Sequence, residues 1–352
     1  MGFVRTTPPR PVDVASVFPE LAPLARAAVR LHPRPGSPSV ADSSVGGPLL
    51  WPAGEPWPHC EAEHPGGSAF TWVGDLKLRR SRRARLEADP GGPECTPEER
   101  AAEERNAAVV AALEEADLDP SYEEPPVPML PVAQLYLRDV PLLRPPGGAD
   151  LLQLLWCPME HEPLWAPSTA LFWRSAAEVV DVLAAPPEPA CADSEGYVPR
   201  PCLLAPELIT EYPNFLELDE ERRTLVADGG RWRAAGVVLG EEYEDDPDAF
   251  YNQRLAEAPG WKVGGWTPWG RTDPYARHCS VCETRMVPLL TIASFERDGE
   301  DDGWMPFEDQ DAAYVPGDSP VQPTAIEVGS TDHLQLYVCP ADAGHPHTGR
   351  IQ

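Results

Sequence analysis

The chain has 352 residues, with 57 Asp and Glu against 28 Lys and Arg, and a formal net charge of −29. A field of this sign repels phosphates, which argues against nucleic acid and against anionic membrane surfaces as partners. The length is enough for about two domains with a substantial core, and no run of apolar residues is long enough to predict a membrane span.

The amino-terminal segment indicates the compartment in which we expect the protein. Residues 1–13 are rich in proline and charges and lack the apolar stretch of a signal peptide. We therefore expect a cytoplasmic protein, where thiols stay reduced. The eight cysteines are then metal ligands or core residues rather than disulfide partners.

Three segments have helical signals. Residues 14–31 are apolar with scattered proline, and we expect a helix there that precedes the first β-rich part. Thr96, with Glu99 three residues later and a proline between them, has the pattern of a capping box. It predicts a helix over about residues 97–117. An Asp-Pro pair opens a third predicted helix over residues 247–257.

Three blocks of sequence occur twice in the same order, which indicates an internal duplication. The blocks are 45–51 and 263–269 (Val-Gly-Gly-x-x-x-Trp), 129–135 and 286–292, and 152–158 and 334–340. The second and third blocks are short, rich in Leu, Val and aromatics, and bounded by Pro, Gly or Asp. We expect each of them to form a strand.

The repeat predicts a mainly β (α+β) fold, with two pseudo-symmetric β-rich copies packed together and a few peripheral helices. Residues 1–183 hold the first copy, the amino-terminal helix and a charged insertion at 73–124 that starts with a cluster of arginines. An acidic or phosphate-bearing partner could contact this cluster, but a solvated face is favoured in so acidic a chain. Residues 184–236 form an acidic connector, and residues 237–352 form the second copy.

The second copy contains a set of metal ligands. Cys279 and Cys282 form a CxxC pair, which places two thiolates on one tight turn at the spacing that tetrahedral zinc accepts. Cys339 and one of two nearby histidines complete four ligands. We expect His345 rather than His347, because a glycine before His345 lets the chain fold back. The alternative is that the cysteines are core residues and both histidines lie at the surface.

The first copy has cysteines and histidines at corresponding places. Cys60 and His64 follow the Gly-Gly block, and Cys157 and His161 follow the third block, so the four residues form a Cys₂His₂ set. A Cys/His nucleophile pair is a weak alternative. Nothing in the sequence orients the histidine, and Pro158 removes the backbone N–H next to the thiol.

The repeated blocks also carry a family resemblance. Residues 44–52, 131–135 and 150–157 resemble the bacterial YwqG-like family, and residues 261–286 are similar to a region of eukaryotic programmed cell death protein 2. The resemblance implies a duplicated, mostly β fold with no established bacterial activity, and eukaryotic relatives that are thought to be chaperones for a ribosomal protein. Thr291 stands where the family tends to have Gln, and the eukaryotic zinc-finger extension is missing, so the chaperone role does not transfer residue by residue.

These observations favour a zinc-stabilised intracellular module, with one or two structural zinc sites, that binds a protein or peptide. It would be a chaperone-like or immunity-type partner of a basic client, because an acidic surface attracts basic partners. The rival is a metal-dependent hydrolase in which one Cys/His site is catalytic, with three protein ligands and a water. A scaffold in which no cysteine binds metal is the third possibility.

Overall fold

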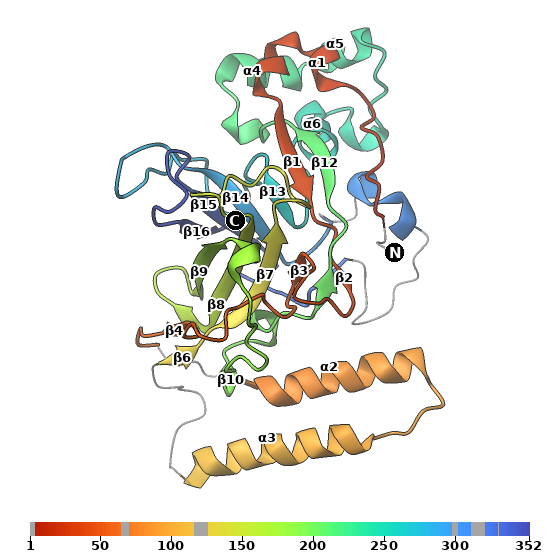
Figure 1. Ribbon diagram of the computed structural model, residues 1–352. Helices are drawn as coiled ribbons and strands as arrows, with labels where there is room; N and C mark the ends of the chain where they lie inside the picture. Colours follow the sequence, from red (N-terminus) through yellow and green to blue (C-terminus); the bar gives the residue numbers. More distant parts are fainter. Residues whose placement is uncertain (1–3, 65–69, 116–125, 298–301, 311–320, 330) are drawn as a thin grey trace.

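The computed structural model describes residues 4–64, 70–115, 126–297, 302–310, 321–329 and 331–352. The protein is a mixed α/β structure in which all pairings between the named strands are antiparallel. Figure 1 shows the sheets in the middle, with a pair of long helices on one side and a group of short helices on the opposite side. The expected α+β character with peripheral helices is thus present.

Two six-stranded sheets form the body. The first has the order β2 (Arg34–Pro35), β11 (Cys202–Leu203), β3 (Ser44–Val45), β7 (Leu130–Tyr136), β8 (Leu151–His161), β9 (Ala166–Arg174). The second has the order β12 (Glu207–Glu211), β1 (Arg26–Arg30), β13 (Lys262–Gly264), β14 (Val287–Ala293), β15 (His333–Val338), β16 (Thr348–Ile351). Two short ribbons pair β4 (His59–Cys60) with β6 (Val127–Pro128) and β5 (Thr71–Trp72) with β10 (Cys191–Ala192).

The four strands predicted from the repeated blocks are confirmed as β7, β8, β14 and β15. They form because their side chains are apolar on both faces. In β8, Leu152, Leu154 and Trp156 enter the large core between the two sheets, whereas Leu155 and Cys157 enter a smaller core on the outer face. A strand buried on both faces gives a continuous apolar run rather than an alternating one.

The two sheets share irregular features at matching places. The register between β7 and β8 shifts between Pro131 and Ala133, and the register between β14 and β15 shifts between Pro288 and Leu290. These are the same positions of the second repeated block. A β-bulge is a specific local feature rather than a defect, so its recurrence is informative.

The first glycine of each Gly-Gly pair has a positive φ, +62° at Gly46 and +75° at Gly264. A Cβ atom at Gly46 would lie 2.8 Å from the carbonyl oxygen of Arg200, and one at Gly264 would lie 3.3 Å from that of Ala27. Glycine is therefore required by the backbone conformation at both positions and by a close backbone approach at Gly46.

A long two-stranded ribbon joins the sheets. Residues 26–35 run antiparallel to residues 202–211 in one register, from the pair Arg26–Glu211 to the pair Pro35–Cys202. At one end β1 continues into the second sheet through β13, and at the other end β11 continues into the first sheet through β3. The segment 184–236, which the sequence suggested to be a connector, thus contributes a strand to both sheets.

The expectation of a helix over residues 14–31 was wrong. The segment forms a single turn of helix, α1 (Val14–Val17), then the 3-10 helix η1 (Pro19–Leu24), and then strand β1. Proline at two positions of η1 removes backbone donors that a continuous helix needs. Ala28 and Val29 are buried between β12 and β13, so sheet pairing decides the conformation of the last part.

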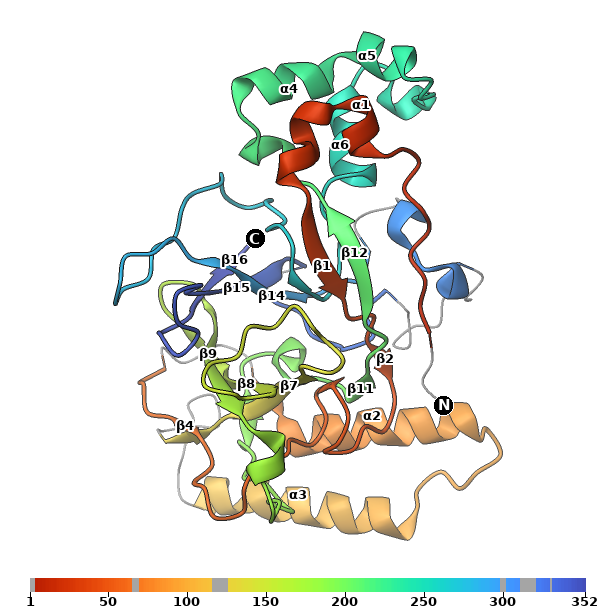
Figure 2. The ribbon, with the colours of Figure 1, turned by 45° about the horizontal axis from the view of Figure 1, so that its top comes forward.

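Short helices build a second core beside the second sheet (Figure 2). They are α1, α4 (Glu220–Ala227), α5 (Gly229–Ala234) and α6 (Pro247–Arg254). The start of α6 is confirmed, because the Asp246 side chain accepts the N–H of Ala249. The remaining 3-10 turns are η2 (Ala176–Glu178), η3 (Glu195–Tyr197), η4 (Phe215–Glu217), η5 (Glu241–Tyr243), η6 (Asp302–Trp304) and η7 (Phe307–Asp309).

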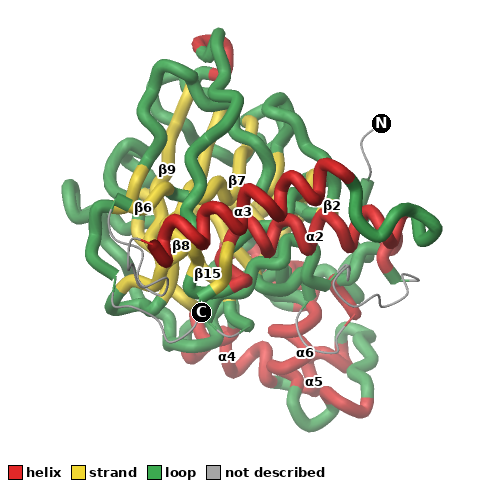
Figure 3. The backbone as a smooth tube through the Cα atoms, turned by 90° about the horizontal axis from the view of Figure 1, so that it is seen from below, coloured by secondary structure: helices red, strands yellow, loops and turns green. Residues whose placement is uncertain are grey.

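The charged insertion is a helical hairpin of α2 (Val73–Ala88) and α3 (Pro97–Glu115), which lies across the strands in Figure 3. The helix α2 was not predicted. Its first turn buries Val73 and Leu76 in the core between the sheets, and its arginines are exposed or half-buried. Several of those basic side chains pair with acidic ones of the same hairpin, as half-buried Arg85 does with Glu99. Residues 116–124 of the insertion lie outside the described residues.

The capping box of α3 gives a first prediction. The N–H of Glu99 donates to the Thr96 hydroxyl at 3.2 Å, and the N–H of Thr96 donates to the Glu99 carboxylate at 2.9 Å. We expect Thr96→Ala to lower the stability of α3 by about 1 kcal/mol, since a helix donor loses its partner. Hydrogen exchange of α3 amides should accelerate while exchange in β7 and β8 stays unchanged; faster exchange in the sheet would contradict a local role for this cap.

Candidate metal centres

The first Cys/His cluster lies at the outer face of the first sheet. Cys60 ends β4, and Cys157 and His161 lie on β8, so these three positions are set by strand pairing. His64 follows β4 in an irregular segment and is 4% exposed. The four residues converge although up to 101 positions separate them in the chain.

The donor atoms of this cluster have the spacing of a metal site. Sγ of Cys157 lies 3.3 Å from Nε2 of His64, and Sγ of Cys60 lies 3.8 Å from Nε2 of His161. All four donor atoms lie within 4.8 Å of one another. A tetrahedral zinc with Zn–S of about 2.3 Å and Zn–N of about 2.0–2.1 Å has donor–donor edges of about 3.3–3.8 Å. The geometry therefore fits one four-coordinate ion.

The second cluster is built from Cys279, Cys282, Cys339 and His345. The Cys279 N–H donates to the carbonyl of Thr284, which closes the turn that carries the CxxC pair. Cys339 directly follows β15. His345 lies in the turn after it, where its N–H donates to the carbonyl of Asp342.

The distances in the second cluster also match a single ion. Sγ of Cys282 and Sγ of Cys339 are 3.4 Å apart, and Sγ of Cys279 is 3.4 Å from Nδ1 of His345. All eight cysteines belong to the described part of the chain and none forms a disulfide. Two sulfurs at 3.4 Å are too far apart for an S–S bond of about 2.05 Å and close to the edge of a zinc tetrahedron.

The two clusters occupy corresponding places in the two sheets. Cys60 pairs with Val127, which lies three residues before the start of β7. The N–H of Cys279 donates to the carbonyl of Thr284, which lies three residues before the start of β14. Cys157 and Cys339 each lie two residues after the position of β8 or β15 that pairs with the proline at the bulge of β7 or β14. The first cluster adds His64 and His161 to its two cysteines, and the second adds Cys282 and His345, so the two sets are Cys₂His₂ and Cys₃His.

Electrostatics favours the thiolate form in parts of both clusters. Hydrogen bonding, first with Cys157 and then with His161, lowers the pKa of the Cys60 thiol to about 3, although burial acts in the opposite direction. Hydrogen bonding with Thr284 lowers the pKa of Cys282 to about 6. Burial raises the pKa of Cys339, a shift that a bound cation would reverse.

The structure also shows which of the two histidines near Cys339 lies in the second cluster. His347 lies outside the second cluster, and its Nε2 hydrogen-bonds with the Thr169 hydroxyl on β9 at 2.8 Å. His345 is the histidine whose ring faces Cys279. Cys95 and Cys202 lie outside both clusters; Sγ of Cys202 is 3.3 Å from the carbonyl of Pro323.

Sequence reasoning missed the residues that surround the first cluster. Burial raises the pKa of the Asp193 carboxyl, and electrostatic interaction with His64 and His161 acts in the opposite direction. The Oδ2 atom of Asp193 accepts the N–H of Glu160 at 2.7 Å. Its Oδ1 and the Nδ1 of His64 are both buried, and neither has a hydrogen-bond partner in the described part of the chain. A carboxylate near a ligating histidine commonly orients the ring. Asp193 lies in no recognisable motif, so no sequence signal points to it.

Comparison with known proteins adds no assignment: no protein-family model matches the chain, and no curated protein matches it. Within the described ranges, no helix is both long and apolar enough to cross a membrane. The functional feature that the structure itself shows is the pair of Cys/His clusters, each of which could hold a metal ion.

Proposed function

We propose that this protein is an internally duplicated, zinc-stabilised module that binds a protein or peptide, with a basic client as its partner. The observation that carries the proposal is the pair of four-residue Cys/His clusters at corresponding places of two sheets. Each cluster offers four side-chain donors, which is the ligand number of a structural zinc site and leaves no position for a reacting water.

Several features support duplication as the origin of this arrangement. Both sheets place a Gly-Gly strand beside a bulged strand, followed by the strand that leads to a cluster cysteine. The ribbon of residues 26–35 and 202–211 is consistent with an approximate two-fold axis between the halves. One of its two strands pairs with β13 of the second sheet, and the other pairs with β3 of the first sheet. The resemblance to YwqG-like proteins, itself part of the proposal, agrees with a duplicated β-rich fold.

The free thiols of the two ligand sets also support an intracellular role. Zinc would be held by Cys60, His64, Cys157 and His161 at the first site and by Cys279, Cys282, Cys339 and His345 at the second. Bound there, the metal would tie strands and turns together, so its binding energy would add to folding energy. A reducing compartment such as the cytoplasm keeps these thiols available as ligands.

Metal analysis tests the zinc sites directly. We expect the purified chain to hold two zinc ions, Cys157→Ala to hold one, and Cys339→Ala to hold one. Cys95→Ala is the matched control and should keep two, because Cys95 lies outside both clusters. X-ray absorption on the single-site variants should give Cys₃His coordination for the second site and Cys₂His₂ for the first.

Two outcomes would contradict this assignment. Stoichiometric zinc in both the Cys157 and the Cys339 variants would remove the clusters as the binding sites. An oxygen ligand from water at either site, with only three protein ligands, would favour the hydrolase instead.

The client is tested by peptide titration. The net charge of −29 should attract Lys- and Arg-rich peptides and repel Asp- and Glu-rich ones of equal length. We expect binding of the basic peptide that weakens as ionic strength rises, and no binding of the acidic one. Equal binding of both peptides, or of neither, would overturn the basic client.

A further inference from the structure

A cavity of about 420 Å³ opens between the two halves of the chain, and none of the residues that line it belongs to either cluster. One wall is the turn between β8 and β9, which includes Leu164 and Trp165. The other wall comes from the second half and includes Arg271, Arg350 and Ile351. This volume lies in the range of about 300–1,000 Å³ that is usual for small-ligand sites.

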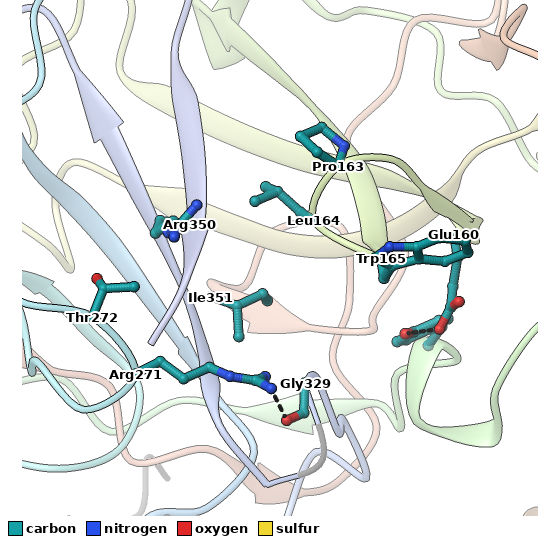
Figure 4. Close-up of a pocket in the computed structure, with 10 residues that line it drawn as sticks. Glu160, Pro163, Leu164, Trp165, Arg271, Thr272, Gly329, Arg350 and Ile351 are labelled. Atoms are coloured by element: carbon teal, nitrogen blue, oxygen red, sulfur yellow. Dashed lines mark hydrogen bonds between the residues drawn. The ribbon is translucent and has the colours of Figure 1, made fainter.

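One end of the cavity combines an exposed aromatic ring with a carboxylate. Trp165 is 52% exposed and has a φ of +49°, a conformation that tryptophan rarely adopts. Glu160 lies beside it in Figure 4, and its Oε1 accepts the hydroxyl of Tyr197 at 3.0 Å. An indole face next to a carboxylate is the combination that binds a guanidinium or ammonium group.

The opposite end carries two arginines in an otherwise acidic protein. The Nε of Arg350 is buried, has no hydrogen-bond partner, and belongs to a guanidinium group 5.9 Å from the Tyr275 ring centroid. No ion pair of Arg350 occurs within the described residues. Arg271 donates through Nη1 to the carbonyl of Gly329 and to the Asp332 carboxylate, with which it forms an ion pair, and no other hydrogen bond of its guanidinium group occurs among the described residues. Arginine forks suit a carboxylate because they can donate two parallel hydrogen bonds.

The floor between these ends is apolar and shaped by a glycine. Leu164 and Ile351 lie between the Trp165 end and Arg350 in Figure 4. Gly329 has a φ of +59°, and a Cβ there would lie 2.6 Å from Cγ2 of Ile351. A side chain at residue 329 would therefore displace Ile351 from the floor of the cavity, whereas glycine leaves room for it.

We infer that this cavity binds a cationic side chain and a carboxylate joined by a short aliphatic chain, as found in the carboxyl-terminal arginine or lysine of a peptide. The cation stacks on Trp165 and pairs with Glu160, the hydrocarbon lies over Leu164 and Ile351, and the carboxylate meets Arg350 and Arg271. The inference rests on the proposed peptide-binding function and gives it a location. Free arginine carries the same groups, so the experiment separates the two sources.

Calorimetric titration of the full zinc-loaded chain with four probes tests this inference. The probes are acetyl-Gly-Gly-Arg with a free carboxylate, the same peptide as its amide, acetyl-Gly-Gly-Glu, and L-arginine. We expect the first peptide to bind and its amide to bind at least tenfold more weakly, because the amide cannot accept from the arginines. The glutamate peptide should not bind, since its side chain meets Glu160.

Two variants locate the binding. Trp165→Asn should weaken the arginine peptide at least tenfold, and asparagine tolerates the positive φ at this position. Arg350→Gln should weaken the acid form but not the amide, which abolishes the discrimination between them. The controls are Phe307→Ala, which changes an aromatic residue with the same 52% exposure, and Arg144→Gln, which changes an exposed arginine outside the cavity. Both controls should bind like the wild type.

The outcomes separate this inference from the proposed function. If Lys- and Arg-rich peptides bind the chain but Trp165→Asn and Arg350→Gln have no effect, the cavity is overturned and the peptide-binding function stands. If L-arginine binds and both variants weaken its binding while no peptide binds, the cavity recognises a cation and a carboxylate as inferred. The inference that a peptide terminus occupies the cavity would then be overturned. Equal affinity for acid and amide would overturn the carboxylate end.

Discussion

Replacing Lys262 with methionine should lower the free energy of unfolding by about 3–5 kcal/mol, because it leaves a buried carboxylate without its counter-ion. Lys262 and Glu211 are both fully buried, and Nζ lies 2.7 Å from Oε1. Glu211 also accepts the N–H groups of Ala258 and Trp266, so it cannot turn away towards solvent. Chemical denaturation of the variant and the wild type measures the loss.

The chain offers a matched control, since Lys77 is its other lysine. Lys77 pairs with Glu188 at the surface, where both side chains are more than a third exposed. Such exposed pairs contribute about 0–1 kcal/mol, so Lys77→Met should be nearly silent. Adding Glu211→Gln to Lys262→Met should restore part of the loss, because the neutral amide removes the unpaired buried charge, although its single oxygen can accept only one of the two N–H groups that bond to different carboxylate oxygens of Glu211. Equal losses for the two lysine variants would contradict the buried-pair interpretation.

Acid should destabilise the fold through two buried histidines. Burial lowers the pKa of His333 to about 4, and burial also lowers the pKa of His32 to about 4. His333 hydrogen-bonds through Nε2 to the carbonyl of Pro268 at 2.8 Å, and His32 through Nε2 to Glu207 at 3.1 Å.

The sign of the effect follows from the lowered pKa values. The unfolded chain takes up these protons near pH 6.5 and the folded chain only near pH 4, so the stability is complete above pH 6.5 and is lost as the pH falls. At pH 5 each histidine should cost about 2 kcal/mol. Unfolding measured at several pH values should show this loss, and His333→Gln should reduce it by about 2 kcal/mol. Metal content must be checked at each pH, and a variant whose pH dependence matches the wild type would refute the role of His333.

Local patterns in the sequence predicted the elements whose signals lie within a few residues. The capping residues Thr96 and Asp246 fall where the helices begin, because a cap is a contact within one turn. The strands β7, β8, β14 and β15 were predicted because their apolar runs are bounded by turn residues. The cluster residues were predicted from spacing within short motifs and from their order in the repeat.

The features that the sequence did not predict depend on partners far along the chain. Residues 26–30 have an apolar pattern that fits a helix or a strand, and only pairing with β12 and β13 decides the outcome. Helix α2 has a mostly charged surface, so its two core contacts at Val73 and Leu76 give too little periodicity to detect. The cavity is lined by several separate segments, and no local pattern joins Trp165 to Arg350.

The ribbon of residues 26–35 and 202–211 sets the order in which the chain can fold during synthesis. Strand β1 is made early, but its neighbours β12 and β13 are complete only when residue 264 has been made. Strand β3 similarly waits for β11, which ends at residue 203. Neither sheet can close while the first half alone has emerged from the ribosome, and contacts over such sequence distances form slowly. The first half therefore exposes apolar strand edges to its surroundings until the second half arrives.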